Sequence, residues 1–278
     1  MHATRIAWRA GAALGLAAML ISGSARPVLA GLVGVAVSGT TDAILWDINE
    51  TSGAATNPRT VNCTPDRQLD CIAFGTNGIL YGVSQGLPSD GPSSGKLYKV
   101  NPITGTPTLV ATMTMFISVE GDIAIDPTSG TLYAIDGSGG PLFTIDKSTG
   151  VGATVGNVGA NLDLSAMAFD NSGALFMVDS FTSTLLKVNK ATGAVIGTTP
   201  MSPAVNGSIG GLAFDPGSGN LYFVGGTTSE LYKVNPTSGA TIDVGPVPVT
   251  DGIYGLTFIP DVTPAAPSTW GRVKGLYR

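Results

Sequence analysis

Short apolar segments alternate with turn-forming residues along most of the chain. Val, Ile, Leu and Thr recur in brief runs that are separated by Gly, Asn, Asp and Pro. Many short apolar runs with turn residues between them are typical of an all-β protein. Hydrophobic residues make up 43% of the 278 residues, so a large core can be buried and the chain is not of the disordered class.

One turn pattern, [Asn/Asp]-x-x-[Ser/Thr]-Gly, recurs along the chain. It stands at residues 49–53, 101–105, 146–150, 189–193 and 235–239. An alternating apolar strand precedes each turn, at residues 44–48, 97–100, 142–145, 185–188 and 231–234. The Asn or Asp side chain caps such a turn and the glycine supplies a positive φ, so the pattern predicts one hairpin repeated five times.

A second family of strands lies upstream of these hairpins. Its members read Ile-Ala-Phe, Met-Ala-Phe or similar, at residues 71–74, 122–125, 166–169 and 211–214. A turn and a further strand follow each of them, at residues 79–83, 131–135, 174–178 and 220–224. Four antiparallel strands in a repeat of ~40–45 residues describe one blade of a β-propeller.

The two ends of the chain complement each other. The N-terminal unit begins at a second strand, residues 32–37, and the C-terminal region supplies an unmatched first strand at residues 255–258. Pairing these segments completes a fifth blade and covers the sheet edges that the two chain ends would otherwise leave open. We therefore predict a β-propeller over residues 31–261, with five blades rather than six or seven.

The repeated motifs carry a family resemblance. The hairpin LYxVNPx[ST]G, following GLAFDPx[ST]GxLY, resembles bacterial secreted propellers of the NHL and YVTN type over residues 31–261. That broad group includes binding modules, surface-layer proteins, lactonases and lyases. The resemblance therefore implies the fold and no single activity, and no catalytic motif of those enzymes is found in this chain.

The first 30 residues form a different kind of segment. Arg5 and Arg9 precede an apolar run from about residue 10 to residue 21, and small residues lead to Ala30. This order predicts a secretory signal peptide cleaved between Ala30 and Gly31. The apolar run is shorter than the ~20 residues of a spanning helix. An uncleaved membrane anchor is the alternative, and no transmembrane segment is expected in the mature chain.

Charge narrows the range of partners. The chain has 14 basic and 19 acidic residues, and removing residues 1–30 takes away three arginines, which leaves 11 against 19, or −8. Nucleic-acid binding needs clusters of Lys and Arg, so an acidic propeller argues against it.

The histidine and cysteine content restricts the catalytic and metal sites that the chain can form. The lone histidine is His2, within the predicted signal, so the mature chain is expected to lack Ser-His-Asp and Cys-His catalysis and His-ligated metal sites. Cys63 and Cys71 are predicted to form a disulfide after export, with a reactive thiol pair as the alternative.

Carboxylate and amide side chains precede the predicted inner strands, where a propeller has its central channel. Oxygen ligands suit Ca²⁺. The candidates for a calcium site are Glu120, Asp163, Asn206 and Asp251. These residues do not occupy equivalent positions in the repeat, so the sequence does not require such a site, and no other cofactor is predicted.

The chain changes character after the last predicted strand. Residues 262–269 are rich in Pro, Ala, Ser and Thr, as in an extended linker. A short basic and aromatic tail follows, containing Trp270, Arg272, Lys274, Tyr277 and Arg278. It resembles short basic tails that some bacteria use as surface-sorting signals. The alternative is a tail that packs on the propeller or frays.

Two functions remain open at this stage. The first is a non-catalytic propeller, secreted or on the cell surface, that binds a protein, a glycan or a cell-surface component or serves as an envelope scaffold. The second is a secreted calcium-dependent hydrolase, similar to lactonases, or a lyase, with a carboxylate centre in the channel.

Overall fold

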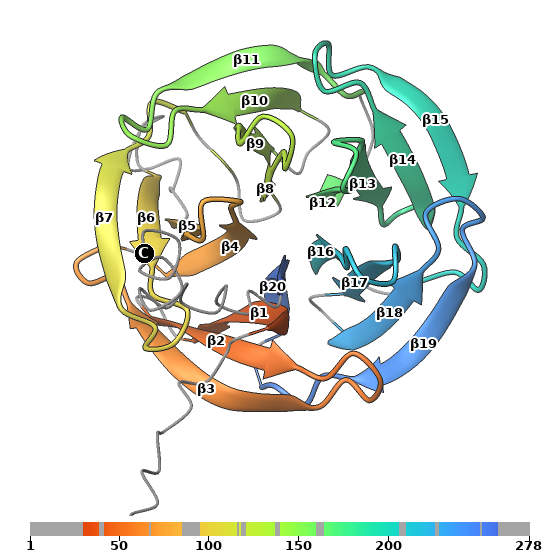
Figure 1. Cartoon of the computed structure of the whole chain (residues 1–278), viewed down its shortest axis with the longest axis horizontal. Coiled ribbons are helices and arrows are strands. Elements are labelled where there is room, and N and C mark those ends of the chain that lie inside the picture. Colours follow the sequence, from red (N-terminus) through yellow and green to blue (C-terminus); the bar gives the residue numbers. More distant parts are fainter. Residues whose placement is uncertain are drawn as a thin grey trace, which may run out of the picture.

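The computed structural model describes residues 30–38, 42–66, 68–84, 95–115, 117, 121–136, 140–159, 164–205, 210–225, 228–250 and 252–260. Twenty strands in this part of the chain form five four-stranded sheets, and all strand pairs within the sheets are antiparallel. The sheets surround a common axis, as Figure 1 shows in a view down that axis. The predicted five-bladed propeller is therefore confirmed.

Each blade runs from an inner strand at the axis to an outer strand at the rim. Blade 1 consists of β20 (Ile253–Ile259), β1 (Gly31–Ser38), β2 (Asp42–Ile48) and β3 (Ala55–Asn62). Blade 2 consists of β4 (Leu69–Phe74), β5 (Leu80–Ser84), β6 (Lys96–Val100) and β7 (Pro107–Thr112). Blade 3 consists of β8 (Asp122–Ile125), β9 (Leu132–Ile135), β10 (Pro141–Ile145) and β11 (Gly152–Asn157).

The last two blades repeat this order. Blade 4 consists of β12 (Leu164–Phe169), β13 (Leu175–Asp179), β14 (Thr184–Val188) and β15 (Val195–Pro200). Blade 5 consists of β16 (Gly210–Phe214), β17 (Leu221–Gly225), β18 (Glu230–Val234) and β19 (Thr241–Pro246). No helix able to cross a bilayer is found among the residues that the structure describes.

Blade 1 closes the ring by joining the two ends of the described chain. β1 pairs with β20 in antiparallel register from Gly31 opposite Ile259 to Ala36 opposite Ile253. The edge of β1 that would otherwise be open is thereby hydrogen-bonded. This is the closure that the complementary chain ends predict.

Alternate side chains of an inner strand pack against opposite neighbouring blades. In β4, Leu69 and Ile72 join the apolar cluster shared with blade 1, whereas Cys71 and Ala73 join the cluster shared with blade 3. From Cys71 onward this follows from the two-residue period of a strand, which turns successive side chains to opposite faces. The β-bulge between Leu69 and Cys71 shifts the period by one residue and puts Leu69 on the same face as Ile72. The core is therefore a set of layers between blades.

Small residues are required where inner strands come closest. A Cβ atom on Gly255 of β20 would lie 2.8 Å from the Cα of Cys71 in β4, which is closer than real Cβ contacts. A glycine at this position allows blades 1 and 2 to meet at the axis.

The five predicted turns have the predicted internal geometry. The capping oxygen of Asn49 accepts the N–H of Thr51 at 2.9 Å, and Gly53 has a φ of +70°. Equivalent caps are formed by Asn101, Asp146, Asn189 and Asn235. Each turn joins the third strand of a blade to its fourth.

These turns also contact the preceding blade. A Cβ atom placed on the turn glycine would meet the backbone at the end of the outer strand next door, as with Gly105 of blade 2 and the carbonyl oxygen of Thr60 in blade 1, at 2.5 Å. The corresponding neighbours are Pro246 for Gly53, Thr112 for Gly150, Gly156 for Gly193 and Pro200 for Gly239. The repeated turn therefore links blades as well as strands.

Candidate functional site

A cavity of about 300 Å³ lies on the propeller axis, where the inner strands end. All five blades contribute to its wall through β4, β8, β12, β16 and β20, which surround the centre of the ring in Figure 1. The lining continues into the residues that follow these strands, at Gly75, Pro127, Asn171, Pro216 and Pro260. The site is therefore built by the fivefold repeat and not by a single loop.

Two successive positions of each inner strand line the cavity in all five blades. The first position holds a small residue, namely Ala73, Ala124, Ala168, Ala213 and Thr257. The second holds a large apolar residue, namely Phe74, Ile125, Phe169, Phe214 and Phe258. The small residues fit the crowded centre of the ring, and the next position surrounds the cavity with four phenylalanines and one isoleucine.

Two polar side chains in the wall, those of Thr257 and Asn171, already have partners. The hydroxyl oxygen of Thr257 accepts the backbone N–H of Phe74 at 3.0 Å, which joins the inner strands of blades 1 and 2. The Asn171 amide donates to the carbonyl oxygen of Pro216 at 3.3 Å, which joins the turns of blades 4 and 5. A ligand in the cavity would therefore meet mainly apolar surface.

A buried carboxylate adjoins the cavity wall. Asp122 has no exposed surface, and its two oxygens accept the backbone N–H groups of Ile123 and Met167, each at 2.8 Å. Burial raises the pKa of Asp122 well above its ordinary value, and backbone hydrogen bonds from Met167, Ile123 and Leu212 oppose that rise. Asp122 thus connects β8 with the inner strands of blades 4 and 5.

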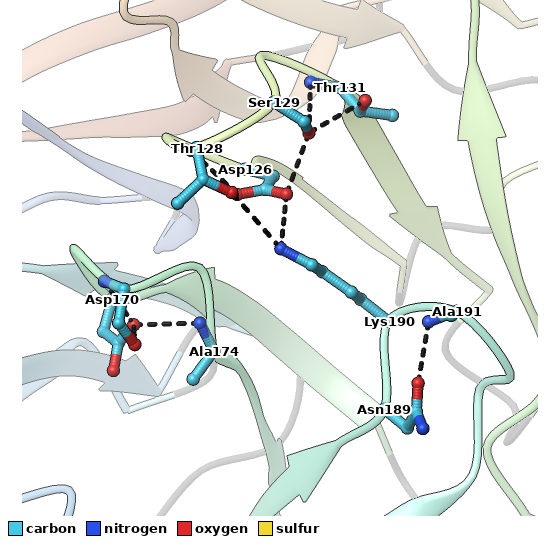
Figure 2. A network of polar contacts seen from close by, with 10 residues as sticks. Asp126, Thr128, Ser129, Thr131, Asp170, Ala174, Asn189, Lys190 and Ala191 are labelled. Atoms are coloured by element: carbon cyan, nitrogen blue, oxygen red, sulfur yellow. Dashed lines mark hydrogen bonds and ion pairs between the residues drawn. The ribbon is translucent and has the colours of Figure 1, made fainter.

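An ion pair connects blades 3 and 4 beside the cavity. Lys190 reaches from the turn at residues 189–193 to Asp126, with 2.6 Å between Nζ and Oδ2, as Figure 2 shows. The same Nζ lies 5.7 Å from the ring centroid of Phe169, one of the cavity phenylalanines. Burial tends to raise the pKa of Asp126, but hydrogen bonds from Lys190, Thr128 and Ser129 outweigh it and lower the pKa to about 2.

The equivalent junction between blades 5 and 1 carries two acids. Glu50 occupies the turn position that Lys190 has in blade 4, and Asp215 follows β16 as Asp126 follows β8. Burial and then the charge of Asp215 raise the pKa of Glu50, and a backbone hydrogen bond from Leu32 and the charge of Lys233 offset this only in part. Burial followed by the charges of Glu50 and Asp215 also raises the pKa of Tyr222 to about 12.

The structure does not test the predicted calcium ligands. Glu120, Asp163, Asn206 and Asp251 all lie outside the described residues. Among the residues that are described, no group of three or more His, Cys, Asp or Glu side chains could hold a metal ion. The calcium centre stays a prediction.

The structure does not show the predicted disulfide. Cys63 and Cys71 are both free and buried. Cys63 packs in the apolar layer between blades 1 and 2. The Cys71 side chain lies on the face of β4 that points away from blade 1, and it packs in the layer between blades 2 and 3. Burial and the nearby acids raise the pKa of the Cys63 thiol to about 12 and that of the Cys71 thiol well above its usual range.

The predicted signal peptide and tail are not tested by the structure. Residues 1–29 and 261–278 lie outside the described part of the chain, which begins at Ala30 and continues into β1 at Gly31. The cleavage between Ala30 and Gly31 and the sorting role of Trp270, Arg272, Lys274, Tyr277 and Arg278 stay predictions.

Sequence reasoning treated the inner-strand motif as core and missed the cavity. The signal was present in the repeated small-then-large pair, such as Ala168-Phe169 and Ala213-Phe214. Five such pairs directed at one axis would have indicated an apolar ring.

Comparison with known proteins agrees with the fold. A family model described as a repeat of unknown function (DUF6923) matches residues 121–260, half of the chain. None of the curated proteins compared with the chain matches it significantly.

Several solved structures share the architecture at low sequence identity. A chain of a nidogen/laminin complex is 14% identical, with a TM-score of 0.55, over 82% of this chain and 98% of that one. A protein of unknown function from Bacteroides caccae is 11% identical, with a TM-score of 0.50, over 83% and 99%. Virginiamycin B lyase from Staphylococcus aureus is 14% identical, with a TM-score of 0.45, over 80% and 72%. At these identities the likeness concerns the fold alone.

Proposed function

The chain belongs to the family of repeats of unknown function DUF6923, and since that description names no activity, we propose a function from the geometry of the axial cavity. The protein is a non-catalytic binding propeller that is exported from the cell. Its axial cavity takes up an apolar group of a partner molecule. The predicted resemblance to NHL and YVTN propellers is compatible with this role.

The ring of phenylalanines at the cavity is the observation that carries the proposal. Ligand sites are concave and mainly apolar, with volumes of roughly 300–1,000 Å³. The cavity of about 300 Å³ is at the lower end of this range, which suits one aromatic or branched aliphatic group. Among the predicted partners, a protein fits better than a glycan, because sugar hydroxyl groups would lose hydrogen bonds against this wall.

The reactive groups of the described residues favour binding over catalysis. Raised pKa values keep the thiols of Cys63 and Cys71 protonated at neutral pH, and a protonated thiol is a poor nucleophile. The carboxylate oxygens of Asp122 are already hydrogen-bonded to backbone N–H groups. These groups stabilise the propeller and do not form a nucleophile–base pair.

Binding of the neutral fluorescent probe N-phenyl-1-naphthylamine tests the proposal. We expect saturable binding at a single site, weakened about tenfold or more by Phe214→Asp, since a buried charge in an apolar pocket is strongly unfavourable. The matched control is Phe181→Asp, the same change at a phenylalanine that is 85% exposed and does not line the cavity. Equal loss of binding in both variants, or no saturable binding to the unaltered protein, would contradict the proposal.

Export and calcium are tested separately. N-terminal sequencing of the protein recovered outside the cells is expected to begin at Gly31. Calorimetric unfolding with Ca²⁺ and with EDTA examines the alternative calcium-dependent hydrolase or lyase, because a ligand of the folded state raises the melting temperature. A large calcium-dependent rise would favour that alternative over the binding module.

A further inference from the structure

The axial cavity opens beside the point where the described chain ends. Pro260 is the last described residue, and it lines the cavity together with Phe258. The segment 261–278 therefore starts at the cavity itself. We propose, resting on the function proposed for this cavity, that segment 261–278 docks on its own propeller and inserts the Trp270 side chain between the cavity phenylalanines.

The length of the connection permits this docking. Nine residues, 261–269, separate Pro260 from Trp270. Fully extended, they span at most ~30 Å, at ~3.3 Å per residue. Because the segment begins at the cavity wall, the indole needs to return over only a short distance, and the linker can cover it without being extended.

The chemistry of the tail matches that of the cavity. Indole is a large, rigid and mainly apolar side chain, and it packs well against the faces and edges of phenylalanine rings. The wall presents Phe169, Phe214 and Phe258. The tail also carries Tyr277, but Trp270 is the first aromatic residue after the linker.

The basic charge of the tail also favours its docking on the propeller. After Asp261 the tail contains Arg272, Lys274 and Arg278 and no acidic residue. At the junction of blades 5 and 1, Glu50 lies near enough to Asp215 for the like charges to raise the pKa of Glu50, despite the presence of Lys233. A guanidinium or ammonium group from the tail would offset this repulsion by forming an ion pair, like the pair of Lys190 and Asp126 at the junction of blades 3 and 4.

Tethering makes even a weak contact effective. A group held on a short flexible linker has a local concentration in the millimolar range, so its binding is an intramolecular event. The tail would then occupy the cavity until an external ligand displaces it. The propeller would carry its own competitor for the site.

The fluorescence of Trp270 reports docking directly. In the chain from Gly31 onward, which contains all five blades, Trp46→Phe leaves Trp270 as the sole tryptophan. We expect emission at shorter wavelength and weaker quenching by acrylamide than in the free peptide 261–278. Phe214→Asp should return both values to those of the peptide, whereas the control Phe181→Asp should not.

Probe binding measures the competition. Trp270→Ala should bind N-phenyl-1-naphthylamine about tenfold more tightly than the unaltered chain, because it removes a competitor at millimolar local concentration. The substituted residue lies outside the blades, so loss of folding does not complicate the comparison.

The outcomes separate this inference from the function proposed for the cavity. If both proteins bind the probe equally and Trp270 emits as in the free peptide, docking is wrong while the binding function stands. If the probe binds neither protein but Trp270 is protected in a manner that depends on Phe214, docking stands and the external-ligand function fails. If protection of Trp270 from acrylamide grows with protein concentration, the side chain inserts into a second copy, and docking within one chain is overturned.

Discussion

Asp122 and Asp126 stand four positions apart and have carboxyl groups in opposite electrostatic situations. Asp122 is buried, and its pKa is raised from the ordinary 3.8 because burial disfavours the charged form. The pKa of Asp126 is lowered to about 2, because Lys190 and two neighbouring hydroxyl groups bind its charged form. One aspartate therefore opposes ionisation in the folded state and the other favours it.

These shifts predict two pH regions with opposite slopes of stability. The contribution of Asp126 is present above pH 3.8 and is lost as the pH falls towards 2, on the order of 1 to 2 kcal/mol. The contribution of Asp122 is greatest below pH 3.8 and decreases as the pH rises through its raised folded pKa. Urea unfolding as a function of pH should show Asp126→Asn with a flatter acid limb and Asp122→Asn with a flatter limb above pH 4.

Asp122→Asn is also expected to lower the free energy of unfolding at neutral pH. Asp122→Asn turns an amide N–H₂ group towards a backbone donor and should cost about 1–3 kcal/mol. Asp243→Asn, at an exposed position of β19, is the control for replacing a carboxylate by an amide. Identical pH profiles for all three variants would show that neither buried aspartate has a shifted pKa.

The two cysteines give a second prediction at the scale of single residues. Because Cys63 and Cys71 pack in different layers between blades, we expect protein unfolded without reductant to titrate two thiols. The folded protein should react slowly, since both side chains are buried and both thiol pKa values are raised. Finding no free thiol after unfolding would restore the disulfide that the sequence predicts.

The sequence could not reveal these roles, because each depends on a neighbour that is distant along the chain. Asp122 is the first residue of the inner strand β8, and its partner Met167 is 45 positions away in another blade. Lys190 is 64 positions from Asp126. Spacing within one repeat says nothing about which side chain meets the next blade.

At the scale of elements, the repeated turn shows both what sequence predicts and what it leaves out. The cap and the positive φ were predictable, because Asn or Asp at the first position and Gly at the fifth are local requirements. The contact with the preceding blade was not, because it depends on how the sheets pack. Gly105 serves both purposes, with a φ of +75° and the Thr60 carbonyl beside it.

A pair of glycine substitutions separates these two purposes. Gly219→Ala places a Cβ where no atom lies within 4 Å, at a φ of +71°, so it should cost only the roughly 1–2 kcal/mol of left-handed strain. Gly105→Ala carries the same strain and also presses on the Thr60 oxygen, so it should cost about 2 kcal/mol more. Free energies of unfolding in urea provide the comparison. Equal losses would mean that the contact between blades adds nothing to the requirement for glycine.

At the scale of the whole molecule, repetition made the ring predictable and left its centre undetermined. Five hairpins and two complementary ends are visible in one dimension, and closing them into a ring follows from the need to pair sheet edges. The cavity depends on how far inward the inner strands approach the axis. Residues such as Ala213 and Phe214 look like ordinary core until five blades direct them to one place.

Ring closure yields the last prediction. The chain 31–260 contains all the described strands, whereas the chain 31–252 lacks β20 and leaves β1 without its inner partner. Removing β20 also takes Ile253 and Leu256 out of the apolar cluster between blades 5 and 1. We expect 31–260 to unfold cooperatively in urea, and 31–252 to lose that cooperativity and associate through its open edge.

A synthetic peptide of residues 252–262 should restore the cooperative transition of 31–252, because it supplies the missing strand in the register of Gly31 opposite Ile259. A peptide of the same composition in scrambled order is the control. If 31–252 unfolds as cooperatively as 31–260 without any peptide, four blades and an incomplete fifth form a stable unit. Stability would then come mainly from packing between neighbouring blades, and pairing of the chain ends would serve to seal an edge.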